Sequence, residues 1–566
     1  MSKDNTSEAG ASPKDIPDPK GAGTVGGPDR KARVRDAAAK AGRKRRGRGI
    51  LGGVLSAAVL LAGGAGVVAA SAMLPAAPGS RAVEAGLTDV PAGRNTMVCP
   101  GPAVLPDGAA TGTDAQFSPV SRTARTMLDA LVLSDASGSL PDSKVAALDG
   151  SNSKVVSQAP EKKPAPAPGP PVLTGAAVSQ STNRTMMLDA EPTEEQQAAT
   201  AAVGSYSASD GDLRGLAAAQ CQQPSNDFWV LGANTTVGRT ALLNLSNASG
   251  TPATVNLELF GSKGRIQSPG SRGLLVPPGS SRTINLAGLA PQEEHLSLHV
   301  RSSGGPVAAT VQQSVLRGLT PGGVEHLAPG APPAETQVMT GVEIQDAKAL
   351  RELASQDGFS DAVPALEITV PGAVDAIVDV KLFGPNGQRA LPGGGAVTVK
   401  AGSVTELPLS GVPGGTYTVS VTADVPVAAA ARTVRGLKPG SPGEFAWSPA
   451  AVRLGSQHLL AVPQDGWRFL SFGVPEGRAT VTYTPVTVDG KTGKASTVDI
   501  AGGTTAVVDI QAPAKGPAVA GYIVSASGDP AYGALIVGRN GEPGVSVIGI
   551  QQGALGHEKV AVTLGY

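Results

Sequence analysis

Residues 426–440, PVAAAARTVRGLKPG, place four consecutive alanines between two prolines. Alanine is the strongest helix former, so the run by itself would predict a helix. A related block, PVAATVQQSVLRGLTPG, occupies residues 306–322, where the first glycine stands at position 13 rather than 11. A difference of two residues keeps every side chain on its face of a strand, whereas it would turn a helical face by about 200°. The alanine block is therefore predicted to be a strand, the final edge of its unit, with small side chains that suit a crowded position between two sheets.

The block closes a unit that occurs three times, the third copy being PAYGALIVGRNGEPG at 530–544. Each unit also carries the pattern G-[S/T]-x-x-x-[I/L/V]-x-[L/I], at 279–286, 402–409 and 503–510. The two apolar positions lie two residues apart, so they share one face of a strand. The glycine of this segment precedes the proline of the following block by 27, 24 and 27 residues in the three units. The common order and similar spacing predict three copies of one β-rich unit.

Composition agrees with short strands joined by turns. The 566 residues include 75 glycines and 47 prolines, and only 16% are charged. Units of about 100 residues with about seven short strands are typical of immunoglobulin-like sandwiches. No Cys or Trp framework recurs, so these are predicted to be disulfide-free variants. The fold class is therefore predicted as mostly β, with tandem immunoglobulin-like antiparallel β-sandwiches at 226–334, 335–450 and 451–566, and one short helix within 346–359.

The N-terminal part predicts a membrane anchor. Residues 1–49 hold 13 Lys/Arg against 6 Asp/Glu, and residues 50–74 are uncharged and apolar. Twenty-five residues can cross a hydrocarbon core of about 30 Å, and basic clusters stay in the cytoplasm. We therefore expect a disordered basic cytoplasmic tail, a single-pass signal anchor, a linker at 75–93 and an extracellular remainder. A cleaved signal peptide is the alternative, because residues 70–72 (Ala-Ser-Ala) resemble a cleavage site. A nucleic-acid-binding arm is disfavoured, since the basic run has no aromatic or folded partner.

The chain has two cysteines, Cys99 and Cys221, both in the part predicted to be extracellular. An even number of cysteines in an oxidising compartment predicts a disulfide. The region that they bound, 94–225, is expected to be irregular and β-rich. A Pro/Ala-rich insert at 134–172 is expected to be extended and mobile.

Several motifs together resemble a known family. They are CPGP at 99–102, CQQPSNDFWVLGA at 221–233 and LLNLSNASGTPATVNLELFG at 242–261, placed after a basic tail and a single anchor. This arrangement is similar to an actinobacterial family of exported, membrane-anchored proteins classed as a domain of unknown function. The resemblance covers roughly residues 90–566 and implies no catalytic residues.

The sequence offers little catalytic chemistry. His295 and His299 stand four residues apart, but the apolar residues alternate with them. This alternation predicts a strand with both histidines on its polar surface, with weak metal binding as the alternative. Trp467, Phe469 and Phe472 form an aromatic cluster that could stack on a sugar, or supply core residues of the third unit. No catalytic, cofactor-binding or metal-binding residues are predicted.

The leading functional hypothesis is a non-enzymatic, membrane-anchored structural or interaction protein of the cell envelope. Its expected partners are the membrane, and envelope polysaccharide or other exported proteins, without nucleic acid or cofactor. The first alternative is a glycan-binding accessory subunit of a cell-envelope enzyme or transport complex, with the aromatic cluster as the contact. The second is an uncharacterised hydrolase with a cleft at a domain junction.

Overall fold

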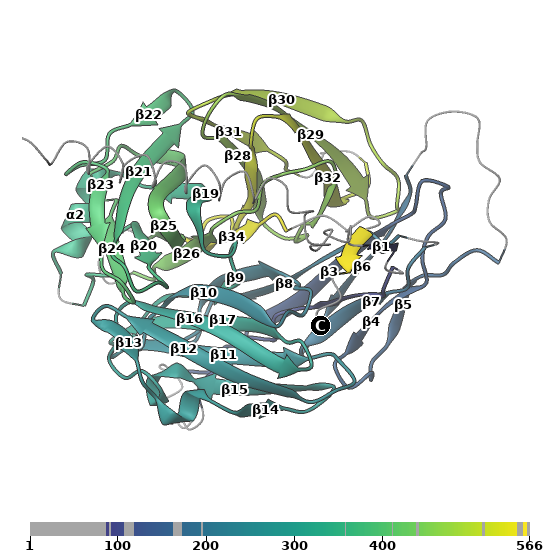
Figure 1. The fold of residues 1–566 in the computed structure, drawn as a ribbon, viewed down its shortest axis with the longest axis horizontal. Helices are drawn as coiled ribbons and strands as arrows, with labels where there is room; N and C mark the ends of the chain where they lie inside the picture. The colour runs from purple at the N-terminus through teal and green to yellow at the C-terminus, as the bar shows by residue number, and fades with distance from the viewer. Residues whose placement is uncertain are drawn as a thin grey trace, which may run out of the picture. The chain divides into compact units, whose positions relative to one another are not determined.

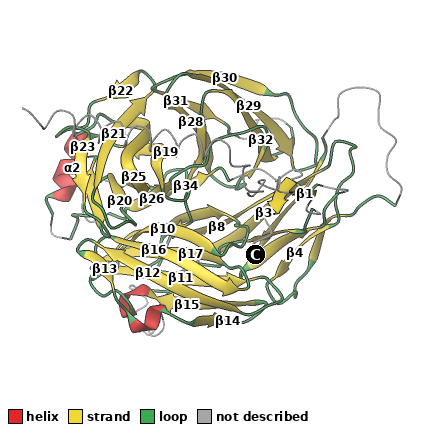
Figure 2. Ribbon diagram, in the orientation of Figure 1, coloured by secondary structure: helices red, strands yellow, loops and turns green. Residues whose placement is uncertain are grey.

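Strands make up most of the secondary structure of this protein (Figures 1 and 2). The computed structural model describes residues 86–89, 92–106, 118–161, 173–193, 196–356, 358–409, 411–436, 441–511, 516–551 and 559–562. Apart from Gly86, these belong to the unit that spans Leu87–Tyr566. The predicted tail (1–49), anchor (50–74) and most of the linker (75–93) lie outside the described residues. Among those that are described, no helix is long and apolar enough to cross a membrane.

The strands form four modules of two sheets each, which we number first to fourth along the chain. The first module pairs β2 (Asn95–Val98), β7 (Met186–Ala190), β4 (Ser143–Ala147) and β5 (Lys154–Ser157) in one sheet, and β6 (Gly175–Ser181), β3 (Arg125–Leu133), β8 (Thr200–Ala208) and β9 (Gly215–Gln220) in the other. The second pairs β10 (Asp227–Ala233), β16 (Leu296–Gly304), β12 (Ala253–Gly261), β13 (Gly264–Ile266) and β14 (Leu274–Val276), and then β15 (Ser280–Asn285), β11 (Arg239–Asn247), β17 (Ala308–Arg317) and β18 (Thr320–Leu327).

The third and fourth modules follow the same plan. The third pairs β19 (Ala334–Ile344), β25 (Gly415–Arg435), β21 (Ala376–Gly384), β22 (Gly387–Arg389) and β23 (Ala396–Val399), and then β24 (Val404–Pro408), β20 (Ala365–Thr369), β25 again and β26 (Glu444–Pro449). The fourth pairs β27 (His458–Ala461), β32 (Val519–Gly528), β29 (Arg478–Thr487) and β30 (Ser496–Ala501), and then β31 (Thr504–Asp509), β28 (Trp467–Val474), β33 (Tyr532–Gly538) and β34 (Val545–Gly549). A separate two-stranded sheet pairs β1 (Gly86–Asp89) with β35 (Lys559–Val562).

One strand order recurs in all four modules. With β13 and β14 counted as one fourth position, and likewise β22 and β23, the first strand pairs with the sixth, the sixth with the third, and the third with the fourth. In the other sheet the order is fifth, second, seventh, eighth. In the third module β25 serves as both the sixth and the seventh strand. The mostly-β, antiparallel fold class predicted from the sequence is confirmed. The region 94–225, expected to be irregular, holds a module with the same order as the other three.

The segment predicted as a mobile insert, 134–172, contains β4 and β5, the third and fourth strands of the first module. Residues 162–172 lie outside the described part of the chain. The Pro/Ala/Lys-rich composition of the later part of this segment led to a prediction of extended chain for the whole segment, including the earlier part that contains the two strands. These two strands, SKVAA and KVVS, are too short to stand out in the sequence.

The alanine block is a strand, as predicted, but it is not an edge. Ala428–Ala431 are buried in β25, where all four pair with β20, and Ala430 and Ala431 also pair with β26 on the other side. β25 also runs through Pro426 without a break. Val427 still pairs with β19 of one sheet, whereas Ala428 pairs with β20 of the other. A proline has no N–H for a sheet ladder, and here it stands where the strand changes partners.

The remaining helical segments are short. α2 (Ala347–Ala354) lies within the predicted helical segment 346–359. Two single turns, η2 (Pro269–Ser271) and η3 (Leu286–Gly288), belong to the second module.

Neighbouring modules share their hydrophobic cores. One continuous cluster of buried side chains extends from the second module into the third. Another joins the fourth module to the first, where Val203 and Ala218 pack with Leu460 and Ile548. The eighth strands of the modules, β9, β18, β26 and β34, contact one another in a ring: β9 meets β18, β18 meets β26, β26 meets β34 and β34 meets β9, with a smaller contact between β9 and β26. We call these four the inner strands; β9, β26 and β34 are labelled near the middle of Figure 1. The contacts among the four modules therefore form a closed cycle.

Candidate functional site

Two buried glutamates join the inner strands. Glu444 begins β26, and its Oε2 accepts the N–H of Leu216 in β9 at 2.7 Å. Its Oε1 accepts the N–H of Val324 in β18 at 3.0 Å. Gly215 and Gly323 make room for this carboxyl, because a Cβ at either position would collide with it. One side chain of the third module thus binds the backbone of the first and second.

Glu325 of β18 makes the complementary connection. Ser546 of β34 donates to its carboxyl, with Oγ 2.9 Å from Oε1 and 3.0 Å from Oε2. The same hydroxyl lies 3.1 Å from the N–H of Ala218 in β9, which donates to it, and 3.0 Å from the Ala218 carbonyl oxygen. The second, fourth and first modules therefore meet at Ser546.

Burial dominates the electrostatics of this interior. Loss of solvation raises the pKa of both Glu325 and Glu444 well above the usual value, even though backbone N–H groups and Ser546 oppose it. Burial also lowers the pKa of the neighbouring His326 to about 4. These groups therefore favour their neutral forms in the folded chain, which suits a role in holding modules together.

The junction of the second and third modules contains a compact ion-pair network. Asp361 accepts from Arg239 at 2.7 Å (Nη2 to Oδ1) and 3.0 Å (Nε to Oδ2), and from Arg317 Nη2 at 2.8 Å. The three side chains are 9–11% exposed. Burial alone would raise the pKa of Asp361, but the two guanidinium groups together lower it.

The same junction holds a histidine between two carboxylates. His295 Nδ1 lies 3.0 Å from Glu367 Oε1 and 3.6 Å from Glu406 Oε2. Burial would lower the pKa of His295, but the hydrogen bond to Glu367 and the nearby negative charges outweigh it and raise the pKa. Among the described residues, these three form the one group of histidine and carboxylate side chains whose geometry could hold a metal ion.

His299 has a different environment. Its Nε2 lies 2.9 Å from Asp227 Oδ1 and its Nδ1 lies 3.1 Å from Glu258 Oε2, while its ring stacks on Trp229 at 4.4 Å. The expectation that both histidines lie on an exposed surface was therefore wrong. Their side chains are only 17% and 13% exposed, because neighbouring elements pack against this part of β16.

A hollow of about 280 Å³ lies where the first, second and fourth modules meet. Its lining is mostly uncharged and rich in side-chain amides, from Asn95, Gln222, Gln223, Gln457 and Gln551, with Phe228 as an aromatic wall. Gln223 and Gln457 are exposed at the rim. Amides donate and accept hydrogen bonds equally, so such a lining suits a neutral, polar ligand.

The structure places the predicted site residues as follows. Cys99 and Cys221 form the predicted disulfide, with their Cα atoms 4.0 Å apart. Phe472 is fully buried in the core of the fourth module. Trp467 is half-buried, and its indole N–H donates to the Arg539 carbonyl oxygen at 3.1 Å.

The Trp467 ring is already in contact on one face. The guanidinium carbon of Arg435 lies 4.5 Å from its centroid, and Phe469 packs at 5.5 Å. The three aromatic residues therefore do not form one exposed platform. Arg435 occupies the place of a sugar on that face, and glycan contact at Trp467 stays a prediction.

Sequence reasoning missed the inner strands and their glutamates. A weak signal exists, because in three modules a Pro-Gly pair directly precedes Gly323, Glu444 and Val545. The residues that follow the Pro-Gly pair differ in each copy, so comparison of the repeats does not identify the two glutamates.

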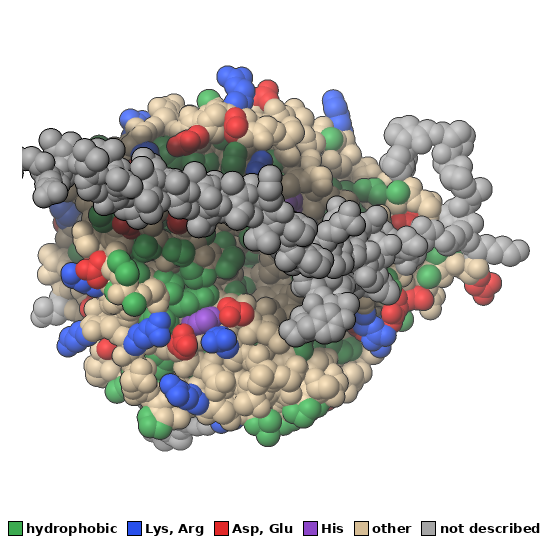
Figure 3. All heavy atoms as spheres, in the orientation of Figure 1, with side chains coloured by type: hydrophobic (Ala, Val, Ile, Leu, Met, Phe, Trp, Pro, Cys, Tyr) green, Lys and Arg blue, Asp and Glu red, His purple; other side chains and the backbone are tan. Residues whose placement is uncertain are grey.

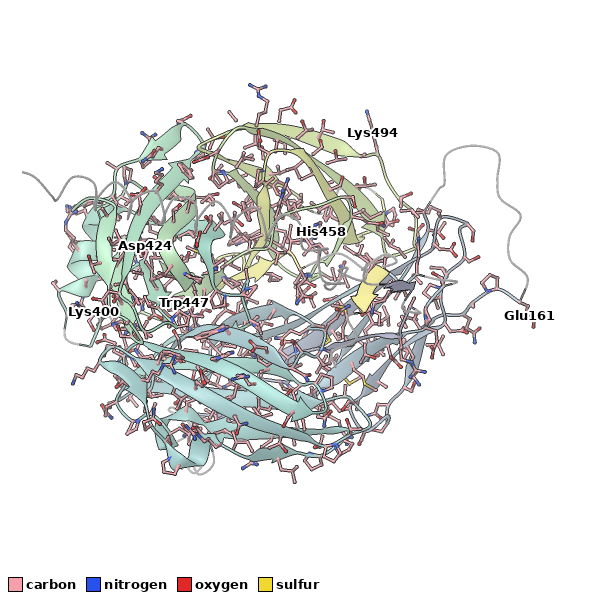
Figure 4. The ribbon with its side chains drawn as sticks, viewed as in Figure 1. Glu161, Lys400, Asp424, Trp447, His458 and Lys494 are labelled. Carbon is pink, nitrogen blue, oxygen red and sulfur yellow. A yellow bond between two sulfur atoms is a disulfide. The ribbon has the colours of Figure 1, made fainter. Side chains whose placement is uncertain are left out.

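Figure 4 labels Trp447, on inner strand β26, and His458 toward the middle of the view, and Lys494 near its edge.

Residues 176–511 match a family described as a family of unknown function (DUF5719). The chain belongs to this family. The match covers more than half of the chain and agrees with the resemblance in the sequence. Among curated proteins there is no match. A solved structure named "Biofilm associated protein - BSP domain" matches 84% of this chain and 98% of its own at 12% identity, with a TM-score of 0.11. A similarity at that score carries no argument about fold or function.

Proposed function

We propose that this member of the family is a non-catalytic interaction protein of the cell envelope. In this proposal residues 50–74 anchor the chain in the membrane and the four modules lie outside the cell as one rigid scaffold. The observation that carries the proposal is the closed cycle of inner strands, in which Glu325 and Glu444 bind backbone or hydroxyl groups of other modules. Carboxyls used in this way stabilise an assembly and are not free for acid–base chemistry.

The surface supports a binding role without a strong preference for charge. On the face shown in Figure 3, Lys/Arg and Asp/Glu side chains are intermixed rather than gathered into a patch of one sign. A basic stripe is the usual feature of a nucleic-acid-binding surface. We therefore infer protein or neutral polymer partners.

Topology is tested by labelling intact cells with a membrane-impermeant maleimide. The variant Lys494→Cys places a thiol at an exposed position of the fourth module, and Ser7→Cys places one in the predicted cytoplasmic tail. We expect Lys494→Cys to be labelled in intact cells and Ser7→Cys only after lysis. Labelling of Lys494→Cys only after lysis would overturn the envelope proposal.

Interaction is tested by photo-crosslinking in living cells. A photoreactive residue at exposed Lys400 or Lys494 should capture an envelope protein or polymer, whereas the same residue at buried Leu470 should capture none. Equal capture from the buried position, or none from a panel of exposed positions on all four modules, would refute the scaffold role.

The amide-lined hollow favours glycan binding as the second candidate. Its neutral donors and acceptors and Phe228 are the groups that recognise hydroxyls and the apolar face of a sugar. The test measures binding of the purified full chain to insoluble cell-wall polysaccharide. We expect the double variant Gln223→Leu/Gln457→Leu to bind at least tenfold less and Trp467→Phe to bind normally. Loss only in Trp467→Phe would move the site to the predicted aromatic cluster, and loss in neither would eliminate both sites.

A further inference from the structure

Two carboxylates face each other across the junction of the second and third modules. Glu367 of β20 and Glu406 of β24 are directly opposite in the antiparallel register. Their side chains are 1% and 18% exposed. Like charges at opposite positions of a strand pair repel each other, and burial strengthens the repulsion. This part of the junction therefore requires positive charge.

His295 of the second module brings a ligand atom to the pair. Its Nδ1 lies 3.0 Å from Glu367 Oε1 and 3.6 Å from Glu406 Oε2. In a tetrahedral site with bonds of about 2.0–2.2 Å to nitrogen and oxygen, ligand atoms lie roughly 3.3–3.5 Å apart. The two distances fall on either side of that value. The ligand atoms of the three residues all lie within 4.8 Å of one another, which is close enough for one ion to be placed among them.

The second oxygen of Glu367 provides an independent observation. Oε2 is buried and has no hydrogen-bond partner among the described residues. Buried polar atoms without a partner are uncommon in proteins, and a bound ion or an ordered water often satisfies them. Glu367 also lines a cavity of about 40 Å³, which has room for a water molecule.

The charge balance leaves room for a cation. Arg432 Nη2 lies 2.9 Å from Glu406 Oε2, although the pair lacks hydrogen-bond geometry. One guanidinium offsets one of the two carboxylates, and the other can be offset either by a proton on His295 or by a metal ion bound in its place. Arg432 itself is held from behind, because its Nε donates to the Val363 carbonyl oxygen at 3.0 Å.

The surrounding contacts fix the approach of the two modules. Two residues further along each strand, the hydroxyls of Ser297 and Thr369 are 2.7 Å apart and both residues are fully buried. This contact joins β16 to β20 next to the His295–Glu367 pair. The backbone segments that carry His295, Glu367 and Glu406 are therefore fixed relative to one another by this contact and by the pairing of β20 with β24.

We propose that His295 Nδ1, Glu367 Oε1 and Glu406 Oε2 bind one divalent transition-metal ion of the zinc class across the junction of the second and third modules. Imidazole with two carboxylates suits zinc and its neighbours, whereas calcium and magnesium prefer sites made of oxygen alone. The ion would link two modules without taking part in the envelope role proposed above.

The test measures zinc binding to the purified full chain, carrying an affinity tag without histidine, at pH 7.5. Free Zn²⁺ is set in the micromolar range by a chelator, and bound zinc is counted by elemental analysis. We expect one zinc per chain, with the dissociation constant raised at least tenfold in His295→Ala and in Glu367→Gln. Mg²⁺ and Ca²⁺ at the same concentration should not compete.

His299→Ala is the matched control, because His299 also contacts two carboxylates but uses a different ring nitrogen for each. It should bind zinc as the unmodified chain does. The thermal midpoint of each variant without zinc shows whether it folds, and added zinc should raise that midpoint in the unmodified chain but not in Glu367→Gln. Absence of zinc binding by the unmodified chain, or equal loss in His299→Ala, would overturn the proposal.

Discussion

Replacing Asp361 by asparagine tests how firmly the second and third modules are joined. The carboxylate of Asp361 accepts three hydrogen bonds from Arg239 and Arg317. An asparagine of the same shape keeps one acceptor oxygen and presents an N–H₂ group to a guanidinium in place of the other. The substitution therefore leaves two largely buried cations with neither a counter-charge nor a complete set of acceptors.

The expected loss follows from burial. All three side chains are 9–11% exposed, so water replaces few of the lost contacts. Removing one partner of a buried ion pair typically costs about 3–5 kcal/mol, because the remaining charge stays buried. We expect Asp361→Asn to lower the free energy of unfolding by about that amount.

Urea unfolding, followed by tryptophan fluorescence and by circular dichroism, provides the measurement. Asp375→Asn is the control, because Asp375 pairs with Lys400 at 2.7 Å on the exposed surface. Surface pairs contribute little, so this control should unfold close to the unmodified chain. The double variant Asp361→Asn/Arg317→Gln should lose less than the sum of the two single losses, because the residues interact directly. If Asp361→Asn unfolds with its control, the network does not hold the junction.

Three further predictions concern other parts of the molecule. Burial raises the pKa of Glu325 and Glu444, so the folded chain keeps protons that the unfolded chain releases above about pH 4.5. The contribution of these two groups to the free energy of unfolding is therefore complete below that pH, and it is lost as the pH rises toward their pKa values in the folded chain. Each of Glu325→Gln and Glu444→Gln should thus flatten the decline in unfolding free energy as the pH rises above about 4.5, by at most about 1.4 kcal/mol per pH unit, and an unchanged slope in calorimetry would contradict the assignment. Cys99→Ser should lower the stability of the first module by up to about 5 kcal/mol, since the disulfide closes a loop of 122 residues; reductant should reproduce this in the unmodified chain and leave the variant unaffected. Gly232→Ala should cost about 1–3 kcal/mol more than Gly273→Ala, because both residues have positive φ but only a Cβ on Gly232 would meet the Trp447 ring, at 2.6 Å; equal thermal midpoints would show that the ring moves aside.

The sequence predicts the parts of this fold that depend on local pattern. Alternation and repeat spacing identify the alanine block as a strand, because a shift of two residues preserves the faces of a strand but not of a helix. The two cysteines predict their own disulfide. The immunoglobulin-like identity of the modules remains a prediction.

The inner strands could not be predicted in this way. Glu444 and Leu216 are 228 residues apart, and Ser546 and Glu325 are 221 residues apart. Each interaction depends on how whole modules pack, and each inner strand contributes a different side chain to it. The first module was missed for a related reason, since its shared feature with the others is strand order rather than residue pattern.

The histidine cluster shows the same limit. His295 and Glu367 are 72 residues apart and belong to different modules. Sequence spacing grouped His295 with His299, whereas the structure separates their surroundings. Spacing within one strand says which residues share a face, but not which module covers that face.

The closed cycle of inner strands restricts how this protein can change in length during evolution. An open row of repeated domains can gain or lose a copy at one end, because only one neighbour is affected. Here β34 of the fourth module contacts β9 of the first, so every module has a neighbour on each side in the cycle, besides the contacts that Glu444 and Glu325 make across the middle. Deleting one copy would uncover two inner strands at once, and inserting a fifth would require every junction to adopt a new angle. Copy number is thus set by geometry, and relatives with this arrangement are expected to vary in their loops while keeping four modules.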